Sequence, residues 1–380
     1  MTVVLGKPAF ATKINIVRPQ LPPYAELQDE LAQIITTGML TKGARLAEFE
    51  RAAAEHLRVK HAIGVASCTS GLMLAYQALG LTGEAVLPSF TFMATASALV
   101  WAGVTPVFAD VDFDTTNLDV AAAERAITPK TTAIIATHNF GNPADIEALE
   151  HLARKHNLKL VFDAAHGFGA LYRGAPVGPQ GDVQIYSMTP TKLLVAGEGG
   201  VVATNSDELA EKIRMGREYG ADGTGGSRFA GLNARLTEIN ALLALRGLPH
   251  VDAAARRRNE YAARYAARLT RIPGIEVQKI DPRDRSSYKD FSIVIDAAKF
   301  GMDRDRLAAA LAAENIDTRK YYAPAVHEQT PYARFVREDT SLPATERLAR
   351  GSLSLPLWSE MQDEIIDGIC ETIERIAEER

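Results

Sequence analysis

Residues 133–167 read AIIATHNFGNPADIEALEHLARKHNLKLVFDAAHG. This stretch contains two short apolar runs, Ala133–Thr137 and Leu158–Phe162, on either side of an amphipathic helical pattern at Asp145–His156. Two strands that are joined through a helix normally pair in parallel within one sheet. The stretch therefore predicts a βαβ unit, from which parallel sheets are built.

The same alternation of apolar runs and helical patterns extends in both directions from this unit, over residues 62–204. Five further β-rich runs are found, at Ala62–Val65, Ala85–Leu87, Thr105–Phe108, Val183–Tyr186 and Val201–Thr204. Several are continuously apolar, as is typical of strands that are buried on both faces. We therefore predict an α/β fold with a mostly parallel seven-stranded sheet sandwiched by helices. Because such sheets bind ligands at the carboxyl ends of their strands, we expect the functional residues there.

Helical patterns dominate after Asn205, and the longest of them is a basic-faced run at Val251–Leu269. The later β-like runs are short and lie between helical patterns, at Ile275–Lys279, Asp290–Ile295 and Ser352–Leu355. This change of pattern predicts a second, smaller unit of mixed α+β structure. We expect a large domain at residues 1–250 and a small C-terminal domain at residues 251–380.

The charge and cysteine content exclude several classes of protein. The chain has 42 basic and 47 acidic residues, whereas nucleic-acid-binding proteins usually have a basic excess. Two cysteines, Cys68 and Cys370, cannot form a disulfide framework or a four-ligand zinc site, and they fit a reducing cytosol. The longest uncharged stretch, residues 85–109, contains two prolines and is typical of strand–helix–strand structure. With no signal-peptide pattern at the N-terminus, we expect a cytoplasmic protein that binds no nucleic acid, membrane or metal.

A single lysine follows the predicted strand at Val183–Tyr186, in the segment Tyr186-Ser187-Met188-Thr189-Pro190-Thr191-Lys192. Lys192 is the only charged residue between Asp182 and Glu198. In apolar surroundings the pKa of a lysine falls, and its amine becomes a nucleophile that forms Schiff bases. The alternative is an ordinary solvated lysine in a loop.

An acidic residue, Asp163, ends the apolar run at 160–162 and is followed by Ala164-Ala165-His166. A buried carboxylate at this position needs a partner. It either caps the next turn or pairs with the cationic ring nitrogen of a bound cofactor. Pyridoxal 5'-phosphate requires this combination of a Schiff-base lysine and an acid at its pyridinium nitrogen.

Two further segments fit the same cofactor. Ser67, Cys68 and Thr69 lie where the first predicted strand meets a helix, and a helix N-terminus offers N–H groups to a phosphate. Phe92 follows another strand, where a minority of aromatic rings stack on planar ligands. Ordinary helix capping and core packing are the respective alternatives. A phosphate-binding helix, a stacking ring, an acid and a lysine in this chain order together indicate a pyridoxal-phosphate site.

In these segments the chain resembles the DegT/DnrJ/EryC1/StrS family of sugar aminotransferases, which have the fold-type-I architecture. The lysine segment and Asp163-Ala164-Ala165-His166 are the most specific parts of the resemblance. It extends over nearly the whole chain, through residues 38–43, 107–111, 231–236, 321–324 and 353–357.

The resemblance implies a role for each matching residue. Lys192 forms the internal aldimine and moves the proton, Asp163 keeps the pyridinium protonated, and His166 lies beside the phenolic oxygen of the cofactor. The remaining cofactor contacts that it implies are a ring sandwich by Phe92 and Ala165, and a phosphate site formed by Ser67, Cys68, Thr69, Ser187 and, from the partner subunit, Asn233. Cys68 departs from the glycine or asparagine more usual in the family. Tyr322 and His327 are candidates for substrate contact, with packing of the small domain as the alternative.

The resemblance further implies a homodimer with shared active sites. It implies transfer of an amino group from an amino acid, with L-glutamate expected, to a nucleotide-linked 4-keto-6-deoxyhexose. The segments Leu99–Gly103 and Asp163–Gly169 favour reaction at C4. Reaction at C3, reaction with a keto-cyclitol, and a non-catalytic regulator that binds the cofactor remain as alternatives. The intact Lys192 and Asp163 argue against the regulator and against a dehydratase relative, in which histidine replaces the lysine.

Overall fold

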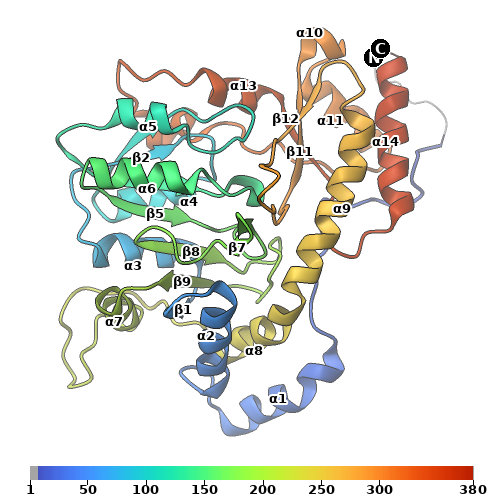
Figure 1. Ribbon diagram of the computed structural model, residues 1–380. Coiled ribbons are helices and arrows are strands. Elements are labelled where there is room, and N and C mark those ends of the chain that lie inside the picture. Colours follow the sequence, from blue (N-terminus) through green and yellow to red (C-terminus); the bar gives the residue numbers. More distant parts are fainter. Residues whose placement is uncertain (1–6, 380) are drawn as a thin grey trace.

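A seven-stranded sheet forms the centre of the larger part of the protein (Figure 1). The computed structural model describes residues 7–379. The strand order is β1-β9-β8-β5-β4-β2-β3, and β9 alone runs antiparallel to its neighbours. The strands are β1 (His61–Val65), β2 (Glu84–Pro88), β3 (Thr105–Ala109), β4 (Thr131–Thr137), β5 (Lys159–Asp163), β8 (Val183–Ser187) and β9 (Gly200–Thr204). The predicted α/β class and mostly parallel sheet are confirmed.

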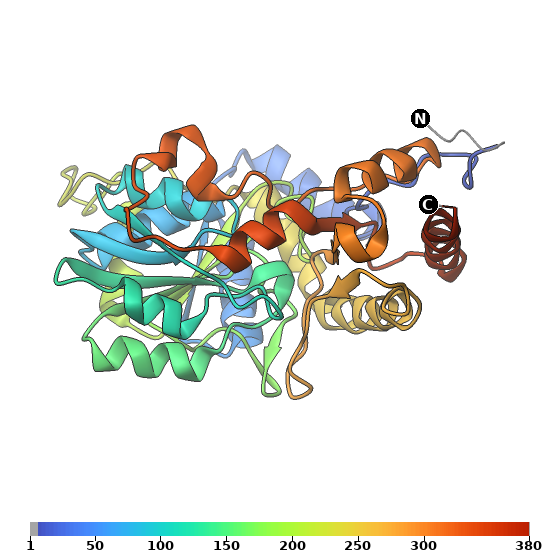
Figure 2. The ribbon, with the colours of Figure 1, turned by 90° about the horizontal axis from the view of Figure 1, so that it is seen from above.

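Helices cover both faces of this sheet, which explains why its strands are apolar at consecutive positions. On one face, Ile63 and Val65 pack in a core with α3 (Cys68–Ala78), α4 (Ala94–Trp101) and α7 (Asp207–Gly216). On the other face, Ala62 packs beneath α2 (Ala44–Leu57) and α8 (Glu238–Gly247), and Ile134 beneath α5 (Val120–Ala126) and α6 (Ile146–Lys155). Alternate side chains of each strand thus enter opposite cores. The view from above in Figure 2 shows the two helical layers.

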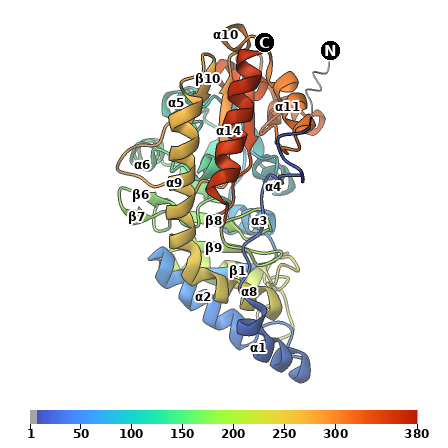
Figure 3. The same cartoon turned by 90° about the vertical axis from the view of Figure 1, so that its right-hand side faces the viewer.

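A second, three-stranded antiparallel sheet lies in the C-terminal part, in the order β10 (Ile275–Val277), β11 (Phe291–Ile295) and β12 (Ser352–Leu355). It shares a core with α9 (Val251–Leu269), α11 (Arg304–Ala313) and α14 (Asp363–Glu378). Figure 3 shows α9 and α14 side by side, and Arg264 and Arg268 of α9 form ion pairs with Asp367 and Glu374 of α14.

The predicted domain boundary at residue 250 falls between the short 3-10 turn η2 (Leu248–His250) and α9. Ile14, close to the N-terminal end of the described chain, packs in the C-terminal core and pairs with Ile316. The division at residue 250 stays a prediction.

The remaining elements are α1 (Tyr24–Thr37), α10 (Ala297–Phe300), α12 (Thr330–Ala333), α13 (Pro343–Gly351), η1 (Asn139–Gly141), η3 (Val326–Glu328), β6 (Leu171–Tyr172) and β7 (Ala175–Pro176). Within residues 7–379, no helix combines the length and the apolar character that crossing a bilayer requires.

The N-terminus of α2 is capped by a residue that is distant in sequence. Glu238, the first residue of α8, is buried, and its carboxylate accepts hydrogen bonds from the N–H groups of Gly43 (2.9 Å), Arg45 (2.9 Å) and Leu46 (3.1 Å). A carboxylate at this position satisfies N–H groups that have no partner within their helix and interacts favourably with the helix dipole. This interaction fastens α2 to α8 beside the sheet.

We predict that Glu238→Ala lowers the free energy of unfolding by about 2–4 kcal/mol, because three N–H groups, that of Leu46 buried and the other two partly buried, lose a charged acceptor. Glu238→Gln, which keeps one acceptor oxygen, is expected to cost less. Urea unfolding of the three proteins measures the difference. Equal stability of Glu238→Ala and the wild type would contradict the capping role.

Candidate active site

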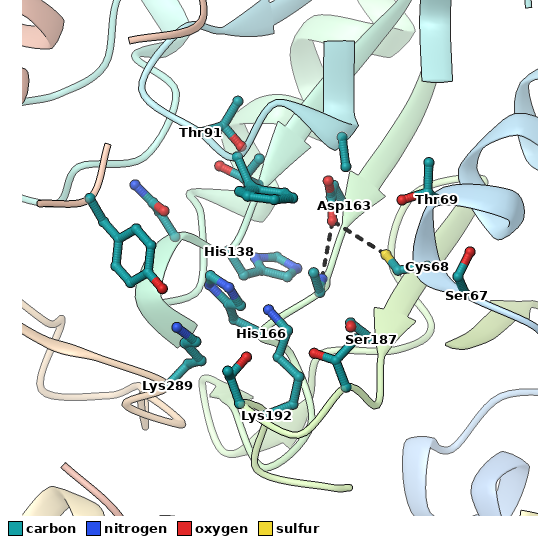
Figure 4. Close-up of a pocket in the computed structure, with 18 of the residues that line it drawn as sticks. Ser67, Cys68, Thr69, Thr91, His138, Asp163, His166, Ser187, Lys192 and Lys289 are labelled. Atoms are coloured by element: carbon teal, nitrogen blue, oxygen red, sulfur yellow. Dashed lines mark hydrogen bonds between the residues drawn. The ribbon is translucent and has the colours of Figure 1, made fainter. Parts of the chain in front are cut away.

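A cavity of about 280 Å³ lies at the carboxyl ends of the parallel strands. Strands β4, β5 and β8 end at its wall with Thr137, Asp163 and Ser187. Figure 4 shows the side chains converging on this space. Ten of the twelve site residues predicted from the sequence line the cavity: Ser67, Cys68, Thr69, Phe92, Asp163, Ala165, His166, Ser187, Lys192 and Tyr322.

The carboxylate of Asp163 is buried at the end of β5 and is held by three neighbours. Thr95 Oγ1 donates to Oδ2 (2.7 Å), the N–H of Ala165 donates to Oδ1 (3.2 Å), and the thiol of Cys68 lies 3.8 Å from Oδ1. Burial raises the pKa of Asp163 above its ordinary value, and these hydrogen bonds oppose the rise. In the described chain Asp163 forms no ion pair. A buried carboxylate without a cation fits a ligand that carries a positive charge on a ring nitrogen.

Lys192 lies in the loop after β8, with its side chain directed into the cavity (Figure 4). Burial lowers the pKa of Lys192 to about 8, and the nearby charge of Lys289 acts in the same direction. A large share of Lys192 is therefore a neutral amine at mildly alkaline pH. This is the form that attacks a carbonyl carbon.

The N-terminus of α3 opens into the cavity opposite Lys192. The hydroxyl of Ser67 caps this helix by accepting from the N–H of Ser70 (3.0 Å), and its role toward a phosphate stays a prediction. Within residues 7–379, the N–H groups of Cys68 and Thr69 in the first turn donate to no backbone or side-chain acceptor. Free N–H groups at the positive end of an eleven-residue helix suit a phosphate.

Two histidines lie between Lys192 and the sheet. Burial lowers the pKa of His166 well below its ordinary value, so its imidazole is neutral. His138, which the sequence analysis missed, stacks on Phe162 with ring centroids 4.9 Å apart, and burial lowers its pKa to about 4. The Nδ1 atom of His138 accepts from the N–H of Ala144 (3.1 Å), so the proton is on Nε2.

Two of the predicted residues do not line the cavity. Asn233 is exposed and pairs with Glu218 in an isolated bridge. His327 hydrogen-bonds through Nδ1 to the hydroxyl of Ser89 (2.7 Å). Tyr322, by contrast, lies at the cavity and stacks on Phe140 with ring centroids 5.7 Å apart. The roles predicted for these three residues are not tested by this geometry.

Sequence reasoning also missed Thr95, which donates to Asp163, and Lys289, which lines the cavity. Thr95 lies in α4 and its hydroxyl is 3.1 Å from that of Thr91, but threonines are common in such segments. Lys289 comes from the segment before β11, more than ninety residues from Lys192, and only the tertiary fold brings it to the cavity. Neither position had a sequence signal that separates it from ordinary surface or core residues.

The family follows from comparison with known proteins, because residues 24–374 match the model of the DegT/DnrJ/EryC1/StrS aminotransferase family. The chain belongs to this family. Membership confirms the predicted resemblance, the aminotransferase class and the pyridoxal-phosphate cofactor. The free helix N-terminus, the unpaired Asp163 and the half-buried Lys192 are groups that fit this cofactor.

Three relatives match over nearly their full lengths. A Streptomyces venezuelae dTDP-3-amino-3,4,6-trideoxy-alpha-D-glucose transaminase is 35% identical, with 93% of this chain and 94% of the relative covered. A Shigella dysenteriae dTDP-4-amino-4,6-dideoxy-D-glucose transaminase is 33% identical, with 98% and 100% covered. The crystal structure of DesI with its TDP-sugar product has a TM-score of 0.92 and 37% identity, with 98% and 95% covered.

We predict that Thr95→Val reduces turnover by about tenfold or more, because Asp163 loses a hydrogen bond that favours its charged form. Thr95→Ser keeps the hydroxyl and should stay close to the wild type. Steady-state kinetics with saturating cofactor measures the effect. If the valine and serine variants had equal activity, the hydroxyl would have no such role.

We predict that cofactor-free protein reacts with pyridoxal phosphate at a rate that rises with pH, reaches half its maximum near pH 8 and levels off above about pH 9. The neutral amine of Lys192 is the reactive form, and its fraction increases as pH passes the lowered pKa of about 8. Stopped-flow absorbance from pH 6 to pH 10, with Lys192→Ala as the control, gives the profile. A rate still rising steeply at pH 10 would indicate an unperturbed lysine.

Proposed function

We propose that this protein transfers an amino group from L-glutamate to C4 of a nucleotide-linked 4-keto-6-deoxyhexose. The observation that carries the proposal is the cavity that combines Lys192, Asp163 and the free N-terminus of α3 in a chain of this family. The Shigella relative, whose name specifies a 4-amino-4,6-dideoxy sugar, supports reaction at C4 because it matches over its full length.

In this proposal, the predicted site residues divide the contacts with the cofactor. The N–H groups of Cys68 and Thr69, with the hydroxyls of Ser67 and Ser187, bind the phosphate. The carboxylate of Asp163 pairs with the ring nitrogen. His166 lies beside the phenolic oxygen, while Phe92 and Ala165 contact the two faces of the ring. Asn233 reaches the phosphate from the partner subunit.

Lys192 then has two tasks. Its amine holds the cofactor covalently before substrate arrives, and afterwards it carries a proton between the substrate carbon and the cofactor. A lysine with a pKa of about 8 both releases and takes up a proton near neutral pH. The bound cofactor supplies the electron sink that stabilises negative charge at the substrate carbon. Asp163 maintains that sink because its charge keeps the ring nitrogen protonated.

Reaction at C3 is the second candidate, because the Streptomyces relative is named for a 3-amino sugar and has similar identity. The test is incubation of purified protein with glutamate and a panel of nucleotide 4-keto and 3-keto sugars, with the position of the new amine read by NMR. The proposal expects amination at C4. Amination at C3, or of a keto-cyclitol, would overturn the choice of carbon, and no amination at all would favour a regulator.

We also propose that the protein works as a homodimer in the cytoplasm, with domains at residues 1–250 and 251–380. Large apolar side chains are exposed on α1, on the segments that flank it and on α8, at Leu21, Tyr24, Ile35, Met39, Leu40 and Ile239. Because α1 packs against α8, these exposed side chains support a subunit interface on this side of the protein. Asn233 comes shortly before α8 in the sequence. The two free cysteines fit a reducing compartment.

We predict that mixing two inactive proteins, Lys192→Ala and Asn233→Ala, restores activity. If each site takes its lysine from one subunit and its asparagine from the other, a heterodimer has one doubly altered site and one intact site. The measurement is activity after subunit exchange, which mass spectrometry of tagged subunits verifies. Exchange without recovered activity would show that the two residues act within one subunit.

A further inference from the structure

Lys289 is a second lysine at the active-site cavity, and the tasks proposed above leave it without a function. Its side chain is 7% exposed and lines the cavity together with Lys192. Figure 4 shows the amino ends of Lys289 and Lys192 directed toward the same space, below His166. A charged side chain in such a place is costly unless the site uses it or compensates it.

The backbone that carries Lys289 is fixed from two sides. Its N–H donates to the carbonyl oxygen of Phe140 (2.9 Å), in the wall of the larger part of the protein. The buried guanidinium of Arg258 on α9 donates to the carbonyl oxygens of Tyr288 (3.1 Å) and Lys289 (3.4 Å). The position of the lysine is therefore set before any substrate binds.

The ammonium group of Lys289 is also held in place. Asp290 accepts from it with both oxygens, at 2.9 and 2.7 Å, and the ammonium lies 4.6 Å from the ring centroid of Tyr321. Asp290 is itself buried and offsets the cost of burying the cation. An ammonium has three N–H donors, of which Asp290 takes two. In the described part of the chain no other acceptor bonds to it, so one donor remains for a ligand.

The remaining N–H group of Lys289 is available to bind an anionic group of a substrate. Lys192 and Lys289 are the only lysine or arginine residues of residues 7–379 that line it, and both histidines with lowered pKa are neutral. Lys192 is occupied with the cofactor, whose phosphate binds at the N-terminus of α3. An amino acid has a carboxylate on the same carbon that loses its amino group. A nucleotide sugar has its negative charges on phosphates, several bonds away from its ketone.

We propose that Lys289, oriented by Asp290, binds the α-carboxylate of the amino-acid donor. This proposal rests on the proposed function and adds the residue that recognises the donor. Because the keto-sugar has no anionic group at its reacting carbon, Lys289 contributes to the first half-reaction and not to the second. Donor selection and keto-sugar selection are then made by different groups of one cavity.

The test compares Lys289→Met with Lys299→Met, which removes a lysine of an exposed pair with Asp296. Stopped-flow absorbance follows each half-reaction of the holoenzyme separately. We expect the dissociation constant for glutamate to rise by about 10- to 100-fold in Lys289→Met, as for loss of a charge-assisted hydrogen bond. The keto-sugar half-reaction should change less than about threefold, and Lys299→Met should match the wild type in both.

A second readout does not depend on turnover. Glutarate has both carboxylates of the donor but no amino group, and calorimetry measures its binding to the holoenzyme. Because Lys289→Met leaves Asp290 buried without its cation, the double variant Lys289→Met/Asp290→Asn is measured beside it. Both should lose glutarate binding by a similar factor, whereas Lys289→Arg should retain part of it.

Unchanged glutarate affinity in the folded double variant, or equal losses in the two half-reactions, would overturn the proposal. If those outcomes were seen while the wild-type protein still transferred amino groups, only the role of Lys289 would be wrong and the proposed function would stand. If the wild type accepted no amino group from any amino acid, the proposed function would itself be wrong, and this proposal with it.

Discussion

The buried carboxylate of Asp163 is the constraint on which the active site depends. Strand β5 delivers it to the cavity, and Thr95, Cys68 and the N–H of Ala165 surround it, yet no cation of the described chain pairs with it. Such a group is stable in its charged form only beside positive charge. A buried carboxylate without a cation suits a ligand whose ring carries a positive charge. In the proposed function, α3 and the loop with Lys192 would hold the phosphate and the reactive carbon of that ring.

The remaining architecture keeps these groups at fixed separations. Six parallel strands end at one edge of the sheet, so residues distant in sequence, such as Ser67, Asp163 and Ser187, meet there. Helices on both faces make the sheet rigid, and Glu238 fastens α2 beside it. The C-terminal part completes the cavity with Lys289 and two tyrosines, Tyr321 and Tyr322. The cofactor groups thus come from the large sheet, and the inferred donor site comes from the smaller part.

The sequence predicted those features that depend on local pattern. Continuous apolar runs located the seven strands to within a residue or two, and the residues that follow them, Asp163 and Lys192 above all, proved to line one cavity. Thr95 and Lys289 escaped prediction because their importance comes from tertiary contacts, a hydroxyl 2.7 Å from Asp163 and an ammonium brought from a distant segment. The packing of Ile14 with the C-terminal core could not be predicted either, because a single apolar residue has no periodicity.

The central claim is that Asp163 keeps the ring nitrogen of the bound cofactor protonated. NMR of protein loaded with cofactor that is isotope-labelled at this nitrogen measures its protonation directly. The account predicts a pyridinium chemical shift in the wild type across about pH 6 to 9, and a neutral pyridine shift in Asp163→Ala over the same range. A neutral ring nitrogen in the wild type, or a pyridinium that persists without the carboxylate, would contradict it.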